Sequence, residues 1–284
     1  MSAVDEDIRL DLGHIVLAAR VHGPEEGLPV LALHGWLDNA NSFARLAPRL
    51  SGLRIVALDL AGHGHSGHRP PGASYALADY AHDVLQVAQR LGWQRFALLG
   101  HSLGAVIAVQ LAGALPERVS HLALIDGLLP PTAAAQDAAE RLGLALQARL
   151  RRPGRDKTRY SCFEDAVAAR MGGALAVSEE AARLLAERGV MQVPGGYCWR
   201  SDRRLTLPSP LRLSEAQALS FVHRIVCPTR LVVAQDGLLA HSDALLERLP
   251  VDHVKLPGGH HLHLDDEQGA DLVADCFNRF MGFS

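Results

Sequence analysis

The sequence predicts an α/β fold in which a mainly parallel sheet is covered by helices on both faces. Short apolar segments typical of strands alternate with segments of helical periodicity through most of the chain. One such strand runs directly into Gly100-His-Ser-Leu-Gly104, and a helical pattern follows. The alternation breaks between residues 127 and 220, where helical patterns follow one another. We therefore expect one α/β core that carries a helical insertion.

The expected core elements follow from apolar periodicity and from the Gly, Pro and polar residues that bound each segment. The strands are expected at residues 15–22, 29–33, 54–60, 96–99, 119–125, 229–234 and 253–256. The helices of the core are expected at residues 42–50, 77–91, 103–115 and 265–280. Asn41 or Ser42 is the expected N-cap of the first of these helices.

The insertion is marked by helical patterns and by Pro- and Gly-rich joints at 152–154 and 194–196. The helical patterns cover residues 133–150, 164–171, 179–188 and 215–222. We expect a core domain made of residues 1–126 and 221–284, with residues 127–220 forming a helical cap above the sheet.

Composition limits the classes of function. The 284 residues carry a formal net charge of −3, so the basic surface that nucleic acid requires is not expected. The sequence contains no apolar run of roughly 20 residues, the length of a membrane span. The first eleven residues are acidic and polar, unlike a signal peptide. The four cysteines are widely spaced and form no Cys-x-x-Cys pair, which predicts reduced thiols in a cytoplasmic protein.

The Gly-x-Ser-x-Gly turn predicts a nucleophile at Ser102. A side chain at Gly100 or Gly104 would clash in so tight a turn, and the serine hydroxyl is then left to point outward. A serine hydroxyl needs a base within hydrogen-bond reach, and that base needs an orienting acid. The chain order of nucleophile, acid and histidine on this fold places the base late. His260, directly after Gly258-Gly259, is the best candidate, whereas His261 and His263 are expected to be packing or surface residues.

The oxyanion of an acyl-transfer reaction needs two N–H donors. One is expected from Leu103, at the N-terminus of the helix that follows the serine, and the other from Trp36 in the early His34-Gly35-Trp36 loop. The neighbouring residues His34, Gly35 and His101 are expected to contribute to substrate binding.

Four segments together resemble the α/β-hydrolase superfamily, and in particular its serine hydrolase-like proteins. They are the run from Leu33 to Phe43, the loop Asp59-Leu-Ala-Gly-His-Gly-His-Ser66, the turn Gly100–Gly104 and the run Gly259-His-His-Leu-His-Leu-Asp265. The resemblance implies a sheet of about eight strands with a cap domain. It also implies hydrolysis through an acyl-enzyme without a cofactor.

The sequence departs from this resemblance at the triad acid. Such proteins often carry the acid in a Gly-x-x-Asp pattern after a late strand, where this chain reads Ala234-Gln-Asp-Gly237. Gly237 falls in the usual slot of the acid, and Asp236 lies one residue early. The alternative is Asp126, because some relatives, the haloalkane dehalogenases among them, place the acid after the strand that ends here at Ile125. Asp126 is favoured, and both residues remain candidates.

Several functions remain open at this stage. The favoured one is hydrolysis of small or medium carboxylic esters by Ser102, with a small-molecule ester as the partner. Thioester, lactone or carbon–carbon hydrolysis would use the same residues, and a non-enzymatic receptor could use the same fold. A zinc hydrolase is a further alternative, because His63, His65 and His68 resemble a histidine zinc motif. That motif's Asp is absent, and we predict neither a metal nor a cofactor. The oligomeric state is not predicted.

Overall fold

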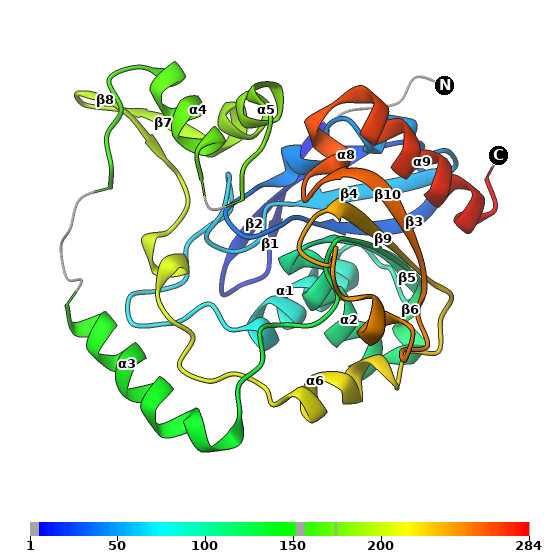
Figure 1. The fold of residues 1–284 in the computed structure, drawn as a ribbon. Helices are drawn as coiled ribbons and strands as arrows, with labels where there is room; N and C mark the ends of the chain where they lie inside the picture. Colours follow the sequence, from blue (N-terminus) through cyan, green and yellow to red (C-terminus); the bar gives the residue numbers. More distant parts are fainter. Residues whose placement is uncertain (1–5, 152–156, 174, 284) are drawn as a thin grey trace.

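An eight-stranded, mostly parallel sheet forms the centre of the computed structural model (Figure 1). Across the sheet the strands are β1 (Glu6–Asp11), β2 (Val16–His22), β4 (Leu53–Leu58), β3 (Leu28–Leu33), β5 (Phe96–His101), β6 (Val119–Ile125), β9 (Thr229–Asp236) and β10 (Asp252–Gly259). β1 and β2 pair in the antiparallel sense, as do β2 and β4, and the strands from β4 to β10 pair in parallel. The structure describes residues 6–151, 157–173 and 175–283, so the joint predicted at 152–154 lies outside the described residues.

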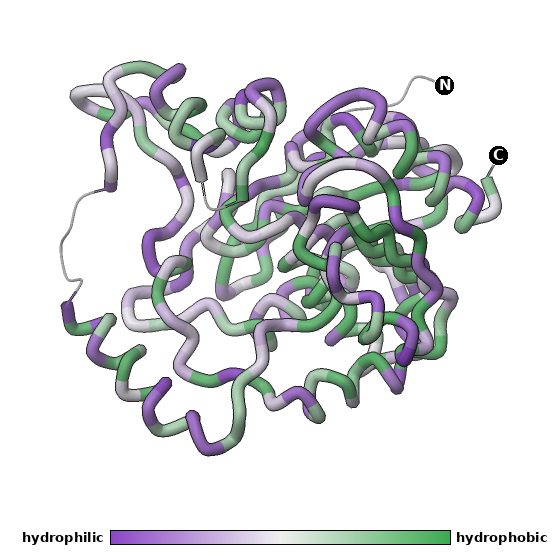
Figure 2. The backbone as a smooth tube through the Cα atoms, viewed as in Figure 1, coloured by the Kyte–Doolittle hydropathy of each residue, from purple (hydrophilic) through white to green (hydrophobic). Residues whose placement is uncertain are grey.

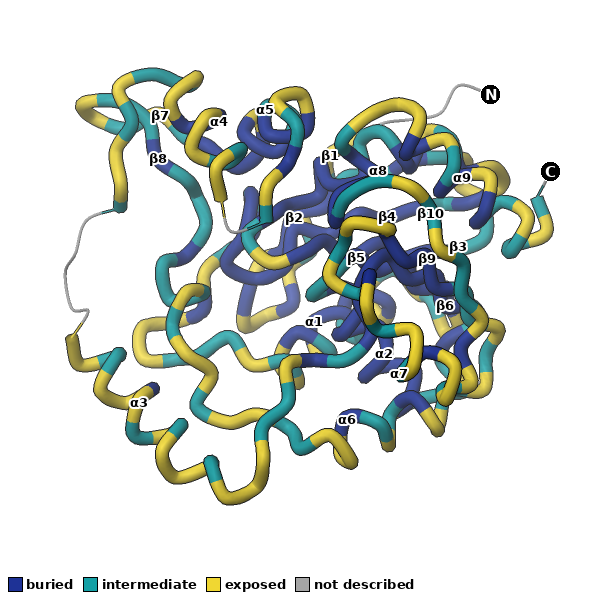
Figure 3. Tube along the Cα trace, viewed as in Figure 1, coloured by how far each residue is buried: buried dark blue, intermediate teal, exposed yellow. Residues whose placement is uncertain are grey.

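Helices cover both faces of the sheet, and each face has its own apolar core. One face is covered by α1 (Leu77–Arg90), α2 (Leu103–Ala114), α6 (Glu215–Val222) and α7 (Asp243–Leu246). The other is covered by η1 (Ala40–Phe43), η2 (Ala47–Arg49), α8 (Leu262–Asp265) and α9 (Glu267–Met281). The central strands are apolar (Figure 2) and buried (Figure 3), as a parallel sheet covered on both faces requires. The α/β fold predicted from alternating strands and helices is therefore confirmed.

Residues 126–228 connect β6 to β9, and we call them the β6–β9 segment. The short 3-10 helix η3 (Pro116–Arg118) precedes β6 and lies outside this segment. In chain order the segment contains η4 (Ala135–Asp137), α3 (Ala138–Leu150), α4 (Phe163–Met171), α5 (Glu179–Gly189), β7 (Val190–Val193), β8 (Gly196–Trp199), η5 (Arg203–Thr206) and α6. β7 and β8 form a separate antiparallel hairpin. α4 and α5 lie above the sheet with this hairpin, whereas α3 stands away from the sheet (Figure 1).

One local prediction was wrong for an identifiable reason. The helix expected at 42–50 is instead the two 3-10 helices η1 and η2, because Pro48 lacks the N–H that a continuous helix would need there. Its cap is Asn39, whose side chain accepts a hydrogen bond from the Asn41 N–H. The closing helix expected at 265–280 is α9, which the Asp266 side chain caps, and the short helix α8 before it was not predicted. Strand β1 was not predicted, since it is mostly exposed and polar, and the β7–β8 hairpin was not predicted, since each of its strands has only four residues.

Two further predictions concern the cysteines and membrane-spanning helices. All four cysteines are free thiols in the structure. Among the described helices, none has both the length and the apolar character needed to cross a bilayer.

Candidate active site

Ser102 lies at the sharp turn between β5 and α2, at the carboxyl edge of the sheet. Its backbone has a φ of 52°, a left-handed conformation that is rare for residues other than glycine. The flanking glycines are required by close backbone contacts. A Cβ on Gly104 would lie 1.9 Å from the Leu33 carbonyl oxygen, and a Cβ on Gly100 would lie 2.6 Å from Ala105 N. The tight turn predicted from the sequence is confirmed.

His260 follows β10 and is buried beside the same edge. Its Nδ1–H donates a hydrogen bond of 2.6 Å to Oδ2 of Asp126. Its Nε2 is buried and has no hydrogen-bond partner among the described residues. The imidazole is therefore oriented at one nitrogen and has an unused lone pair at the other, which is the state that a general base requires.

Asp126 directly follows β6 and is fully buried, with a φ of 41°. Besides the bond from His260, its carboxylate accepts hydrogen bonds from backbone N–H groups, at 2.7 Å from Leu238 and 3.3 Å from Ala234 and Leu239. A buried carboxylate is costly unless it is paired or hydrogen-bonded. The donors around Asp126 meet that requirement and fix the direction of the carboxylate.

Asp236 pairs with Gly259, next to His260, but its side chain does not join this arrangement. It is the last residue of β9, and its side chain is exposed. The neighbouring Gly237 explains the departure seen in the sequence, because a Cβ there would lie 2.2 Å from Oδ2 of Asp126. The structure thus brings Asp126, and not Asp236, to His260, and Gly237 leaves the space that the Asp126 carboxylate occupies.

The two amides expected to bind the oxyanion lie on neighbouring strand ends. Leu33, the last residue of β3, pairs with Gly100 in β5, so the loop that contains Trp36 adjoins the turn that contains Ser102. Leu103 is the first residue of α2, whose first intrahelical bond runs from Val106 N to Ser102 O. The Leu103 N–H therefore precedes the helical hydrogen-bond ladder.

Buried histidines shape the loop after β3. His34 donates from Nδ1 to the Gly35 carbonyl at 2.7 Å and accepts from the Leu60 N–H at Nε2. His63 accepts from the Leu37 N–H at 3.2 Å. Burial lowers the pKa of His34 to about 4 and that of His63 to about 3, so both rings are neutral near pH 7. These neutral rings hold the backbone on either side of Trp36.

The three residues predicted to bind substrate lie at the same edge. The rings of His34 and His101 are fully buried and hydrogen-bonded within the protein. Gly35 lies against His101, since a Cβ on Gly35 would be 2.9 Å from His101 Nδ1. We therefore expect these residues to act through the backbone that they support rather than through side-chain contact with a substrate.

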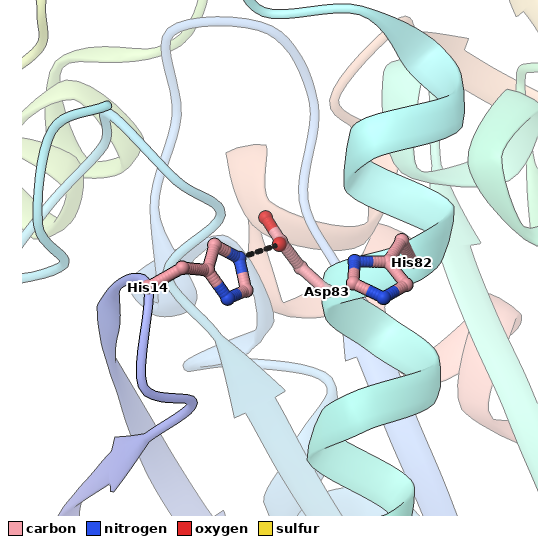
Figure 4. A group of neighbouring side chains, drawn as sticks. All are labelled: His14, His82 and Asp83. Atoms are coloured by element: carbon pink, nitrogen blue, oxygen red, sulfur yellow. Dashed lines mark hydrogen bonds and ion pairs between the residues drawn. The ribbon is translucent and has the colours of Figure 1, made fainter. Parts of the chain in front are cut away.

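Two groups of described side chains come close enough together to hold a metal ion. In the first, His14 and Asp83 are hydrogen-bonded at 2.9 Å with His82 beside them (Figure 4), and Asp83 is also paired with Arg69. The second consists of Asp38, His101 and His261, and the Arg170 guanidinium lies 2.8 Å from that Asp38 carboxylate. A neighbouring guanidinium opposes a second cation in both groups.

The histidines of the possible zinc motif are used differently. His63 supports the loop after β3, and His68 Nε2–H donates to the Arg200 carbonyl at 3.0 Å. In the described part of the chain, His63, His65 and His68 do not form a group of possible metal ligands.

Sequence reasoning missed Asp38 and Arg170. Asp38 is buried, although it lies in a loop, and it contacts both Arg170 of α4 and His261. The available signal was a single charged residue in this loop, but its partners are more than 130 positions away in the chain. His261 and His263, which were expected to be packing or surface residues, are both buried, and each is hydrogen-bonded, His261 to Asp38 and His263 to Ser42.

Several known proteins are similar to this chain in sequence or in structure. The α/β-hydrolase fold family model matches residues 29–166. A serine hydrolase-like protein of Danio rerio is 32% identical, over 92% of this chain and 84% of its own. A hypothetical protein of Pseudomonas aeruginosa PAO1 has a solved structure that is 60% identical, with a TM-score of 0.96 over 98% of this chain and 100% of its own. A thioesterase domain from the curacin biosynthetic pathway is 28% identical, with a TM-score of 0.83 over 95% and 99%. The chain belongs to the α/β-hydrolase family and, within it, is related to the serine hydrolase-like proteins.

Proposed function

We propose that the protein hydrolyses carboxylic esters of small or medium size through an acyl-enzyme on Ser102. The observation that carries this proposal is the pairing of His260 Nδ1–H with Asp126 at 2.6 Å, which leaves Nε2 without a partner among the described residues. It supports a base already oriented by its acid. Ser102 lies on a strained turn after β5, the strand that pairs with β6, which Asp126 follows.

The proposed reaction has two steps. Ser102 Oγ attacks the ester carbonyl carbon while its proton moves to His260 Nε2, and Asp126 stabilises the resulting imidazolium. His260 then gives this proton to the leaving alkoxide, which departs as an alcohol. In the second step His260 takes a proton from water, the hydroxide attacks the acyl carbon, and the proton returns to Ser102 as the acid leaves.

Backbone amides supply the electrostatic part of the proposal. The N–H groups of Leu103 and Trp36 would stabilise the oxyanion of both tetrahedral intermediates. The start of α2 adds the positive end of a helix dipole at Leu103. The insertion at 127–220 would act as a cap that covers the substrate and limits its size. We place this activity in the cytoplasm, with a small-molecule ester as the partner.

Hydrolysis of p-nitrophenyl esters of increasing acyl length tests the proposal. We expect turnover that Ser102→Ala reduces by about 10⁶-fold and that EDTA leaves unchanged. Activity that EDTA abolishes and Ser102→Ala retains would favour the zinc alternative. Absence of turnover on every ester, despite a correctly folded protein, would favour a ligand receptor.

Thioester hydrolysis is a second candidate, because the curacin thioesterase domain is similar over almost the whole chain. The same residues would act, with a thiolate as the leaving group. Acyl-N-acetylcysteamine thioesters, compared with oxygen esters of the same acyl group, separate the two. A higher kcat/KM on the thioester would replace the ester proposal.

A further inference from the structure

Asp38 is a buried carboxylate that joins three separate parts of the chain. It lies in the loop between β3 and η1, and only 2% of its surface is exposed. Its Oδ1 accepts a hydrogen bond of 2.8 Å from Arg170 Nη2, and its Oδ2 accepts one of 3.0 Å from His261 Nε2. Burial alone would raise the pKa of Asp38, but the attraction of His261 and Arg170 holds it well below its usual range. Asp38 is therefore ionised, and its charge needs both partners.

Arg170 comes from the β6–β9 segment, near the end of α4. Its Nη1 donates to the Leu175 carbonyl at 2.8 Å while Nη2 holds Asp38. The guanidinium is thus fixed within its own segment and to the core at once. Nη2 also lies 3.3 Å from Nε2 of His261, the residue that follows His260 in the chain.

His101 provides a second contact with the loop that bears His260. It precedes Ser102, and its Nε2–H donates to the His260 carbonyl at 3.0 Å. Burial, together with repulsion from the neighbouring histidines, lowers the pKa of His101 well below its usual value, so the ring is neutral. Its Nδ1 is then a lone-pair acceptor that faces Oδ2 of Asp38 at 3.8 Å. The backbone of His260 is held by His101, and the next residue is held by Asp38.

We propose that Arg170 and Asp38 are a positioning pair that fixes the loop bearing His260. Through this pair, the position of His260 depends on how α4 packs against the core. This inference rests on the proposed function, because the placement of His260 matters only if His260 is the base. A displacement of about 1 Å at a catalytic group can cost about 10²-fold in rate. The pair therefore acts on kcat through His260 and has no contact with substrate.

A purely structural role predicts a different result. Breaking a buried ion pair destabilises a protein, because one charge is left without a partner. If that were its whole effect, the molecules that remain folded would hydrolyse ester at the wild-type rate. The rate per folded molecule therefore separates positioning from stability.

The experiment compares Arg170→Met, Arg170→Lys and Arg183→Met on p-nitrophenyl butyrate, with folding followed by circular dichroism. Arg183 is the matched control, since it lies on α5 of the same segment but is 42% exposed and pairs with surface glutamates. We expect Arg170→Met to lower kcat per folded molecule by about 10- to 100-fold with little change in KM. Arg170→Lys keeps the charge beside Asp38 and should recover part of this loss, whereas Arg183→Met should match the wild type.

If Arg170→Met does not fold, the double variant Asp38→Asn with Arg170→Met is used, because it leaves neither charge buried alone. It should show the same fall in kcat. Wild-type kcat in a folded Arg170→Met or double variant would overturn the inference, as would a rise in KM alone. These results presuppose wild-type turnover that Ser102→Ala removes, which tests the proposed function separately. A wild type without such turnover overturns both proposals.

Discussion

Asp126 and the position of residue 237 compete for one volume. The Asp126 carboxylate occupies the space in which a Cβ on Gly237 would lie, only 2.2 Å from Oδ2. An acid at 237 and an acid at 126 therefore exclude one another. This steric relation explains why the chain has Gly237 at the usual position of the acid after β9 and an Asp, Asp126, after β6. The sequence favoured Asp126 but left both candidates open, because the contact joins residues more than 100 positions apart.

The two candidate acids should differ greatly when each is made neutral. Asp126→Asn is expected to lower kcat by about 10⁴-fold, because His260 loses the carboxylate that fixes its tautomer and stabilises its charged form. Asp236→Asn serves as the matched control, and its kcat should stay close to that of the wild type. Steady-state kinetics on p-nitrophenyl esters measures both. Equal, mild losses in the two variants would count against either residue as the acid.

Gly237→Ala tests the shared volume directly. The added methyl group must displace the Asp126 carboxylate, so kcat should fall although no reacting group has been removed. Gly172→Ala is a control, since the atom nearest to its new Cβ, the Ala168 carbonyl oxygen, would lie 3.8 Å away. Unchanged activity in Gly237→Ala would show that the carboxylate does not need its present position.

At the scale of elements, the site depends on the close approach of α2 to the end of β3. This approach was predictable in kind, since glycines on both sides of a serine indicate a tight strand-to-helix turn. The surroundings of the site were less predictable. Two 3-10 helices, at Ala40–Phe43 and Ala47–Arg49, are found where one α-helix was expected. The prediction relied on the local apolar spacing and gave too little weight to Pro48. The contact of α4 with Asp38 has no local signal, because it depends on tertiary packing.

Gly104→Ala should separate α2 from β3. Its Cβ would lie 1.9 Å from the Leu33 carbonyl oxygen, and backbone atoms at such a distance must move. We expect a lower melting temperature and a lower kcat, since the Leu103 amide moves with the helix. Gly143→Ala, also within a helix but with open space around it, should instead raise stability by up to about 1 kcal/mol. Thermal unfolding and ester hydrolysis on the two variants measure the difference. A Gly104→Ala protein as stable and active as the wild type would contradict this packing.

At the scale of the whole molecule, neutral buried histidines tie stability to pH. Burial lowers the pKa of His34 to about 4 and those of His63 and His263 to about 3. In the unfolded chain these rings take up protons near pH 6.5, whereas in the folded protein they do not. The unfolded state therefore binds more protons as the pH falls below about 6.5, and the folded state becomes less stable.

Urea unfolding between neutral pH and about pH 5 should show this loss. Each of the three histidines contributes up to about 2 kcal/mol over the interval from pH 6.5 to pH 5, a large part of a typical folding free energy. The loss is complete only below the folded pKa values, near pH 3 to 4. A free energy of unfolding that stays constant from pH 7 to pH 5 would show that these rings are not held neutral.

The central claim, a nucleophilic Ser102 activated by His260, is tested most directly by covalent capture. A fluorophosphonate reacts when the serine oxygen attacks phosphorus and fluoride leaves, so the adduct marks an activated serine. We predict one adduct per chain, found by mass spectrometry on the peptide that contains Ser102. It should be absent in Ser102→Ala and should form far more slowly in His260→Ala. An adduct on another residue, or equal labelling of Ser102→Ala and the wild type, would contradict the account.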